Sequence, residues 1–171
     1  MSKVSVPAGA GEETIVLEET KYGAFQAKVR SGCATFFVDE PFGVGGLASG
    51  PTPYDLLSAA IGTCSLMTMR LFATKHKFPL DHVRIRITHL RNGLYARDRF
   101  IKHIQLIGAL SERQRQTLAK ISDCAPVQLT IARGSEVETI LLSNYPLQDT
   151  ATTRFGHMRD LMEAVDQTGQ N

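Results

Sequence analysis

The longest apolar stretch of the chain predicts one long buried helix. Residues 52–76 are almost all apolar or small, and Arg70 is the one charged side chain in the middle of this run. Thr52 is a good N-cap residue, Pro53 suits the first helical position, and Asp55 stands where a capping box places its acid. Because a helix that is apolar on nearly every side is typical of a protein interior, we expect this helix to form the core.

The remaining patterns are shorter and favour a meander, a hairpin and further helices. Residues 83–88 alternate between apolar and polar, which is the period of a strand with one buried face. Strands are predicted over residues 14–19, 24–30, 34–38, 83–88, 99–107 and 137–142, and further helices over 111–122 and 155–165. Residues 127–132 fit either a helix or a strand. The Gly- and Pro-rich stretch 41–53 predicts a loop.

These elements indicate an α+β protein. A length of 171 residues is usual for one domain, so we expect a flexible tail over residues 1–12 and a single domain over 13–171. The N-terminus has no apolar signal-peptide core, and no run approaches the ~20 apolar residues of a membrane span. We therefore expect a cytoplasmic protein that does not contact a membrane.

Composition and residue spacing exclude several classes of binding site. A net charge of +2 is too small to indicate nucleic-acid binding. No HxxxH, HExxH or CxxC spacing occurs, and the glycines of 43–46 do not follow a nucleotide-binding order, so we expect neither a metal nor a bound cofactor. Three cysteines in a cytosolic chain do not form a disulfide framework, and are instead buried apolar residues, metal ligands or redox groups.

Cys64 and Cys124 are the candidate redox residues, and Cys33 is interpreted as structural. Cys64 lies on an apolar face of the long helix, which favours simple packing. Gly62 and Thr63 could interrupt that helix and place Cys64 near free N–H groups, which lower a thiol pKa. Cys124 follows Asp123, whose charge disfavours an attacking thiolate, but a resolving thiol needs only access to its oxidised partner.

Several motifs, in the same order, carry a resemblance to a known family. The segment GPTPYDLLSAAIGTCSLMTMRLFA, residues 50–73, is followed by PLDHVRIRITH at 79–89 and by FIKHIQLIGALSERQRQTLAKISDCAPV at 100–127. This chain resembles the OsmC/Ohr family of bacterial hydroperoxide-reducing proteins, in particular the OsmC-like branch with PYDLL, GTC and MTMR. The resemblance covers about residues 14–142.

The resemblance implies a fold and a reaction. The fold would be an intertwined α+β homodimer in which long central helices are enclosed by antiparallel sheets. Cys64 would be the peroxidatic thiolate that cleaves the O–O bond of an organic hydroperoxide, and Cys124 would condense with the resulting sulfenic acid. An external dithiol would reopen the disulfide. An apolar stripe around Cys64 would favour an apolar peroxide over hydrogen peroxide.

The chain departs from the family pattern beside each expected partner of Cys64. Organic hydroperoxide reductases carry Glu ten residues before the reactive Cys within an Arg–Glu–Cys set, whereas this chain has Tyr54 there and Asp55 next to it. Asp55 either replaces the acid or only caps the helix. Arg30 is our first choice for the cation that stabilises the thiolate.

The second cysteine is also displaced. In the similar branch this cysteine directly precedes Pro and Val-His-Arg follows, but here Ala125 separates Cys124 from Pro126, and Gln128 stands in place of the His. One place on a helix is a rotation of ~100°. Three alternatives therefore stay open: a two-cysteine peroxidase, a one-cysteine peroxidase resolved by external thiol, and a catalytically degenerate dimer that binds a small apolar ligand.

Overall fold

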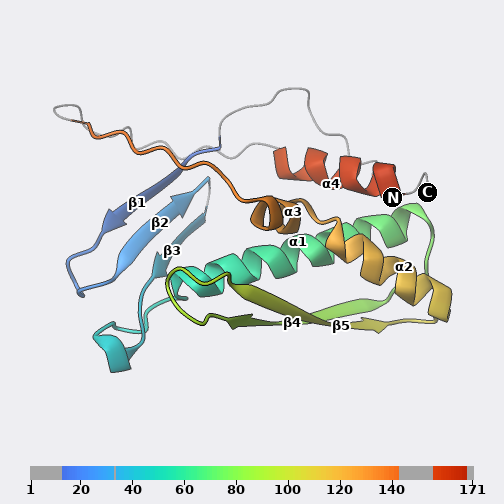
Figure 1. Cartoon of the computed structure of the whole chain (residues 1–171), viewed down its shortest axis with the longest axis horizontal. Helices are drawn as coiled ribbons and strands as arrows, with labels where there is room; N and C mark the ends of the chain where they lie inside the picture. Colours follow the sequence, from blue (N-terminus) through green and yellow to red (C-terminus); the bar gives the residue numbers. More distant parts are fainter. Residues whose placement is uncertain (1–12, 33, 143–155, 169–171) are drawn as a thin grey trace. The chain divides into compact units, whose positions relative to one another are not determined.

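A computed structural model describes residues 13–32, 34–142 and 156–168 of the chain (Figure 1). Over these residues the fold is α+β, with four α-helices and two antiparallel sheets. The elements are β1 (Ile15–Glu19), β2 (Ala27–Ser31), β3 (Ala34–Val38), the short 3₁₀ helix η1 (Phe42–Val44), α1 (Pro53–Lys75), β4 (His82–Leu90), β5 (Arg99–Ile107), α2 (Glu112–Asp123), α3 (Pro126–Arg133) and α4 (Gly156–Thr168).

The described residues form two compact units. One contains residues 13–56, without residue 33, together with 136–142 and Gly156, and the other contains 57–135 and 157–168. Helix α1 begins at the end of the first unit and runs through the second. The expectation of a single domain over 13–171 stays a prediction, and the expected tail over 1–12 lies outside the described residues.

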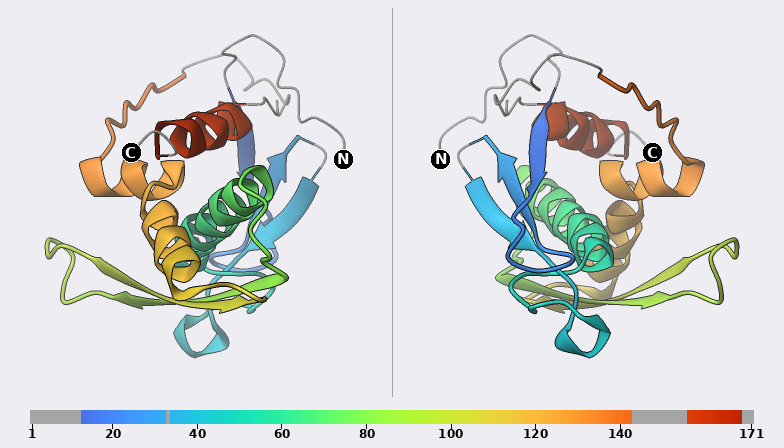
Figure 2. Two further views of the ribbon diagram at one scale, coloured as in Figure 1. Left: turned by 90° about the vertical axis from the view of Figure 1, so that its right-hand side faces the viewer. Right: turned by 90° about the vertical axis from the view of Figure 1, so that its left-hand side faces the viewer.

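Helix α1 is the core element of the second unit. The β4–β5 sheet lies along one side of it and α4 along the opposite side, with α2 and α3 beside them (Figure 2). Met69 and Phe72 of α1 pack with Leu118 and Ile121 of α2 in a buried apolar cluster, which Val165 of α4 joins. The predicted buried helix is confirmed in this unit.

The N-terminus of α1 is capped as the sequence predicts. The Thr52 amide donates to Asp55 Oδ2 at 3.0 Å, and the Asp55 amide donates to Thr52 Oγ1 at 3.2 Å. By length and composition α1 could also span a membrane, so the expectation that no stretch reaches that limit is wrong. The core helix of a soluble protein shares this property, and the buried side chains of α1 fit that interpretation.

The β4–β5 hairpin presents one apolar face and one polar face. Its register pairs His82 with Ile107 and Leu90 with Arg99. Val83 is buried, whereas Arg84 and Arg86 are exposed, as their alternation predicts.

The first unit is a β1–β2–β3 antiparallel meander followed by a tightly folded loop. Buried Asp39 holds this loop by accepting hydrogen bonds from the amides of Leu47 and Ser49 and from the Ser49 hydroxyl. Burial acts to raise the pKa of Asp39, but these bonds and that from the Glu40 amide hold it below its ordinary value. A Cβ at Gly50 would lie 2.0 Å from the Phe37 carbonyl oxygen, so only glycine allows this close approach.

The structure settles one ambiguous segment and contradicts the prediction for another. Residues 127–132, which fit either type of element, lie in α3, whose start is set by Pro126 at its first position. Residues 137–142 form no strand, so that prediction was wrong. Val137, Ile140 and Leu141 are exposed, and this segment has no strand partner within the described residues.

Candidate active site

Cys64 lies inside α1 rather than at a break in it. The helix is continuous from Pro53 to Lys75, so Gly62 and Thr63 do not interrupt it, and the alternative of a second helical segment at Cys64 is excluded. The Cys64 side chain is 1% exposed and faces away from solvent. Its surroundings therefore come from packed neighbouring helices.

The N-terminus of α3 points toward the Cys64 sulfur. The amide of Val127, the second residue of α3, donates to Cys64 Sγ at 3.4 Å. This N–H belongs to the first turn of a helix, where amides have no partner within the helix. Sequence reasoning looked for such an amide on the helix that carries Cys64, but it is supplied 63 residues later.

Helix α4 places an imidazole against the same sulfur. His157 Nε2 lies 3.2 Å from Cys64 Sγ, and the ring is only partly exposed. Sequence analysis predicted this helix but missed the histidine, because a lone His in a terminal helix carries no motif. The contact joins residues 93 apart in the chain.

Apolar side chains also pack around Cys64. Buried Ala125 and Leu161 pack with Cys64 in one cluster, and Leu71, Val127 and Met158 pack against it. The apolar stripe expected around Cys64 is thus extended by α3 and α4. A ligand that reached this sulfur would meet carbon atoms on most sides.

Burial raises the pKa of the Cys64 thiol above its ordinary value. The Val127 amide, the Thr68 side chain and the positive charge of Lys102 act in the opposite direction, while the negative charge of Asp160 adds to the increase. The thiol therefore rests protonated near neutral pH. A reaction at this sulfur needs a base at hand or a change in its burial.

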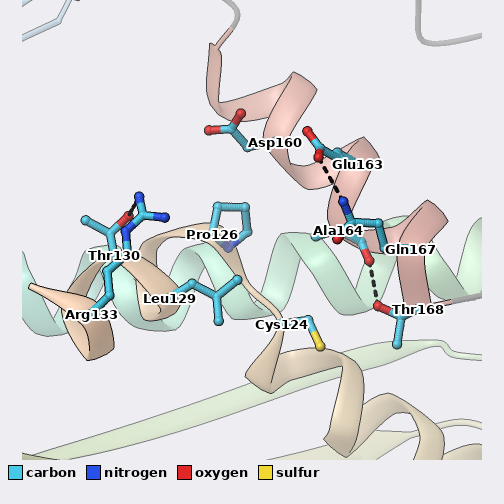
Figure 3. A pocket seen from close by; sticks show the side chains of 10 residues that line it. All are labelled: Cys124, Pro126, Leu129, Thr130, Arg133, Asp160, Glu163, Ala164, Gln167 and Thr168. Atoms are coloured by element: carbon cyan, nitrogen blue, oxygen red, sulfur yellow. Dashed lines mark hydrogen bonds between the residues drawn. The ribbon is translucent and has the colours of Figure 1, made fainter.

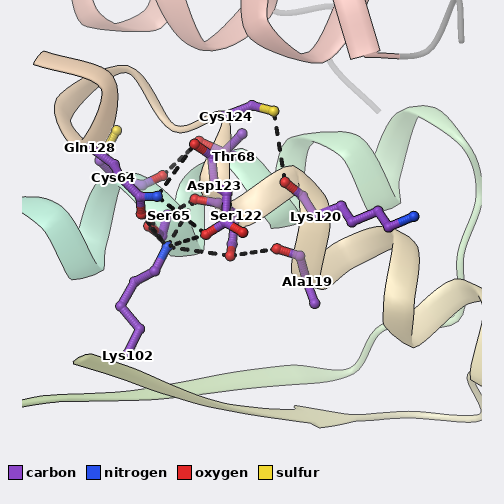
Figure 4. A network of polar contacts seen from close by, with 10 residues as sticks. All are labelled: Cys64, Ser65, Thr68, Lys102, Ala119, Lys120, Ser122, Asp123, Cys124 and Gln128. Carbon is purple, nitrogen blue, oxygen red and sulfur yellow. Dashed lines mark hydrogen bonds and ion pairs between the residues drawn. The ribbon is translucent and has the colours of Figure 1, made fainter. Parts of the chain in front are cut away.

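Lys102 is the cation whose charge acts on Cys64, and Figure 4 shows it in a network of polar contacts. Its ammonium donates to Ser65 Oγ at 3.1 Å and to the Ser122 carbonyl at 3.0 Å, and it also contacts Gln128 Oε1. Burial lowers the pKa of Lys102, while Asp123, at 3.4 Å, acts to raise it. The sequence held a signal for this residue, since Lys102 occupies an inward position of β5 between the partly buried Phe100 and Ile104.

Cys124 lies at the C-terminal cap of α2 and is directed elsewhere. Its thiol donates to the Lys120 carbonyl at 3.7 Å, and Figure 4 shows its sulfur turned toward that residue rather than toward Cys64. Cys124 lines a cleft of about 360 Å³ between α3 and α4, in which Asp160 and Glu163 also lie (Figure 3). Both described cysteines are free thiols. The resolving role of Cys124 stays a prediction.

Ala125, the residue directly before Pro126, faces Cys64 in place of Cys124. We expect Ala125→Cys in a Cys124→Ser background to form an intramolecular disulfide with Cys64 under mild oxidation. Mass spectrometry of the alkylated protein measures it, and Cys124→Ser alone serves as the control that keeps a free thiol at Cys64. Failure of the disulfide to form would contradict the packing of α3 against α1.

The other predicted site residues lie apart from this cluster or in the other unit. Asp55 is used by the helix cap and stands nine residues before Cys64, about 13 Å along α1. Hydrogen bonds from Thr52 hold the pKa of Asp55 below its ordinary value. Arg30 lies on β2, paired with Val16 and Thr35 in the first unit, and its role beside Cys64 stays a prediction. Cys33 lies outside the described residues.

A metal-binding cluster is not found in the described parts of the chain: no three His, Cys, Asp or Glu side chains of residues 13–32, 34–142 and 156–168 are arranged to hold an ion. The expectation that the protein works without a metal or cofactor stays a prediction. The groups in contact at this site are the Cys64 thiol, the His157 imidazole and the Val127 amide.

Comparison with known proteins gives a family match and a fold match. The family model described as OsmC-like protein matches residues 46–140, more than half of the chain. No match was found among curated proteins. The matched region contains Cys64, Lys102 and Cys124 but ends before α4 and therefore before His157.

Solved structures agree on the fold. An OsmC-like protein from Mycoplasma pneumoniae superposes with a TM-score of 0.61 at 18% identity, covering 71% of this chain and 88% of that one. A putative osmotic stress induced and detoxification response protein from Psychrobacter arcticus gives 0.62 at 15% identity, covering 71% and 90%. An organic hydroperoxide resistance protein OsmC from Legionella pneumophila gives 0.55 at 16% identity, covering 72% and 91%. At these identities the likeness shows the fold.

Proposed function

Because the chain belongs to the OsmC-like family, we propose that it is a thiol-dependent peroxidase that reduces organic hydroperoxides at Cys64. The observation that carries the proposal is the set of contacts at Cys64 Sγ, where the Val127 amide and His157 Nε2 meet a sulfur enclosed by apolar side chains. The structurally similar protein from Legionella pneumophila is an organic hydroperoxide resistance protein, which supports organic hydroperoxides as the substrate class. The broader role is that of an osmotic and oxidative stress protein.

The proposed cycle uses one cysteine of this chain. Cys64 attacks the terminal oxygen of the hydroperoxide, an S–O bond forms, the O–O bond breaks, and the products are a sulfenic acid and an alcohol. One thiol of an external dithiol then condenses with the sulfenic acid and releases water. The second thiol of the same dithiol displaces Cys64 and restores the reduced protein. We propose that this cycle takes place in the cytoplasm. We also propose that the protein is a homodimer.

A second candidate function is supported by the burial of Cys64. A thiol that is 1% exposed and whose pKa is raised fits a packing residue in a dimer that binds a small apolar ligand. Native mass spectrometry of the purified protein tests this candidate, because a ligand retained in stoichiometric amount supports it.

Turnover of cumene hydroperoxide with dithiothreitol tests the peroxidase. We expect the parent protein to consume cumene hydroperoxide catalytically and to prefer it to hydrogen peroxide, since the surroundings of Cys64 are apolar. Bovine serum albumin at equal thiol concentration is the control for unspecific thiol oxidation. A folded protein with reduced Cys64 and no turnover would exclude the peroxidase and leave the ligand-binding dimer.

A further inference from the structure

The position of His157 against the buried thiol carries an inference that rests on the proposed function. His157 Nε2 lies 3.2 Å from Cys64 Sγ, so the two side chains are in hydrogen-bond contact. The ring stands in the first turn of α4, and Leu161 one turn later is buried in the Cys64 cluster. The packing of Leu161 therefore holds the imidazole in position.

We propose that His157 is a catalytic residue that takes the proton from the Cys64 thiol and delivers it to the leaving alkoxide. A buried thiol presents its S–H to the unprotonated Nε2. As Sγ attacks the terminal oxygen of the hydroperoxide, Nε2 receives the thiol proton. The O–O bond then breaks with both electrons on the alkoxide oxygen, and that oxygen takes the proton from Nε2.

The step balances without any other reactant. Thiol and hydroperoxide become sulfenic acid and alcohol, sulfur loses two electrons, and the imidazole ends in its starting state. The other charged groups around Cys64 do not replace this base. Lys102 on β5 already donates to Ser65, Ser122 and Gln128, and it is paired with Asp123. Asp160 on α4 acts on Cys64 through its charge.

This role belongs to a part of the chain outside the family match. The match ends at residue 140, whereas α4 begins at Gly156. The Arg–Glu–Cys set expected from the resemblance has Tyr54 in place of Glu, and Asp55 is engaged in the helix cap. In our proposal His157 on α4 takes over the proton transfer that the Arg–Glu–Cys set would otherwise assist.

The test compares His157→Gln with His103→Gln, whose exposed side chain lies on β5 away from Cys64. Two rates are measured between pH 5 and pH 10: oxidation of reduced Cys64 by cumene hydroperoxide in a single turnover, and alkylation of Cys64 by iodoacetamide without peroxide. We expect His157→Gln to slow oxidation near pH 7 by about 10²–10⁴-fold. Its rate should then rise steadily with pH as the thiol ionises, whereas His103→Gln should follow the parent profile.

The two rates separate the inference from the proposed function. A parent that alkylates with a His157-dependent pH profile but does not react with peroxide retains the proton transfer and loses the peroxidase. A parent that reduces peroxide with the same pH profile as His157→Gln overturns the role of His157 and retains the peroxidase. If His157→Gln is destabilised, His157→Asn and circular dichroism at each pH decide, since unchanged rates in a folded variant also overturn the inference.

Discussion

Cys64→Ser is expected to abolish peroxide consumption, whereas Cys124→Ser is expected to keep the turnover of the parent with a dithiol. A serine hydroxyl cannot accept the peroxide oxygen as a sulfur does, so the first reaction of the cycle is lost. Cys124 points to the Lys120 carbonyl, and Ala125 fills the place next to Cys64, so we expect an external thiol, and not Cys124, to resolve the proposed sulfenic acid. Initial rates with cumene hydroperoxide and dithiothreitol measure both effects.

The matched pair also separates the alternatives left by the sequence. Loss of turnover in Cys124→Ser, with normal oxidation of Cys64 in a single turnover, would show that Cys124 resolves and that the α2 cap moves to meet Cys64. Turnover at the parent rate in Cys64→Ser would exclude reduction of the peroxide by Cys64. The two substitutions are the same in type, but only Cys64→Ser changes a buried member of the apolar cluster, so circular dichroism has to show that both variants are folded before their rates are compared.

Leu161→Ala is expected to destabilise the protein by about 2–5 kcal/mol. Leu161 is 1% exposed and packs with Cys64 and Ala125, so its truncation opens a cavity between α4 and α1. Urea unfolding followed by circular dichroism gives the free energy of unfolding. The variant should also expose Cys64 to an aromatic disulfide reagent, because the truncated side chain covers that sulfur.

Leu94→Ala is the matched control, because Leu94 is 72% exposed in the β4–β5 turn. A change within about 0.5 kcal/mol is expected there. An unfolding midpoint of Leu161→Ala equal to that of Leu94→Ala would contradict the packing of α4 on Cys64. It would also remove the structural basis for the role of His157.

Sequence patterns predicted the elements whose local signals agree with their packing. The apolar run of α1, its Thr52–Asp55 cap and the alternation of β4 each specify the observed element. Residues 137–142 show the limit of a short apolar segment as a strand signal, because a strand needs a partner and local sequence does not supply one. Residues 127–132, which lie in α3, are ambiguous in the sequence because so short a run fits either period.

The candidate site was predicted only in part, because its members come from distant segments. Cys64 was identified from the GTC motif, and Ala125 was recognised as the displaced position before Pro126. The Val127 amide carries no side-chain signal at all, and His157 lies outside every motif. Lys102 is a charge on the inward face of an alternating strand, but the alternation by itself indicates only a hairpin and does not show what the charge contacts.

The enclosure of Cys64 has a consequence for the lifetime of the protein under stress. If Cys64 acts as we propose, a sulfenic acid formed under Leu161 and Met158 would be less accessible to a second peroxide molecule, which would otherwise convert it irreversibly to the sulfinic acid. Such shielding slows each turnover, since substrate and reductant both have to reach a covered sulfur. The same shielding would protect Cys64 against hyperoxidation. The protein would then turn over slowly but stay active for longer at high peroxide concentration.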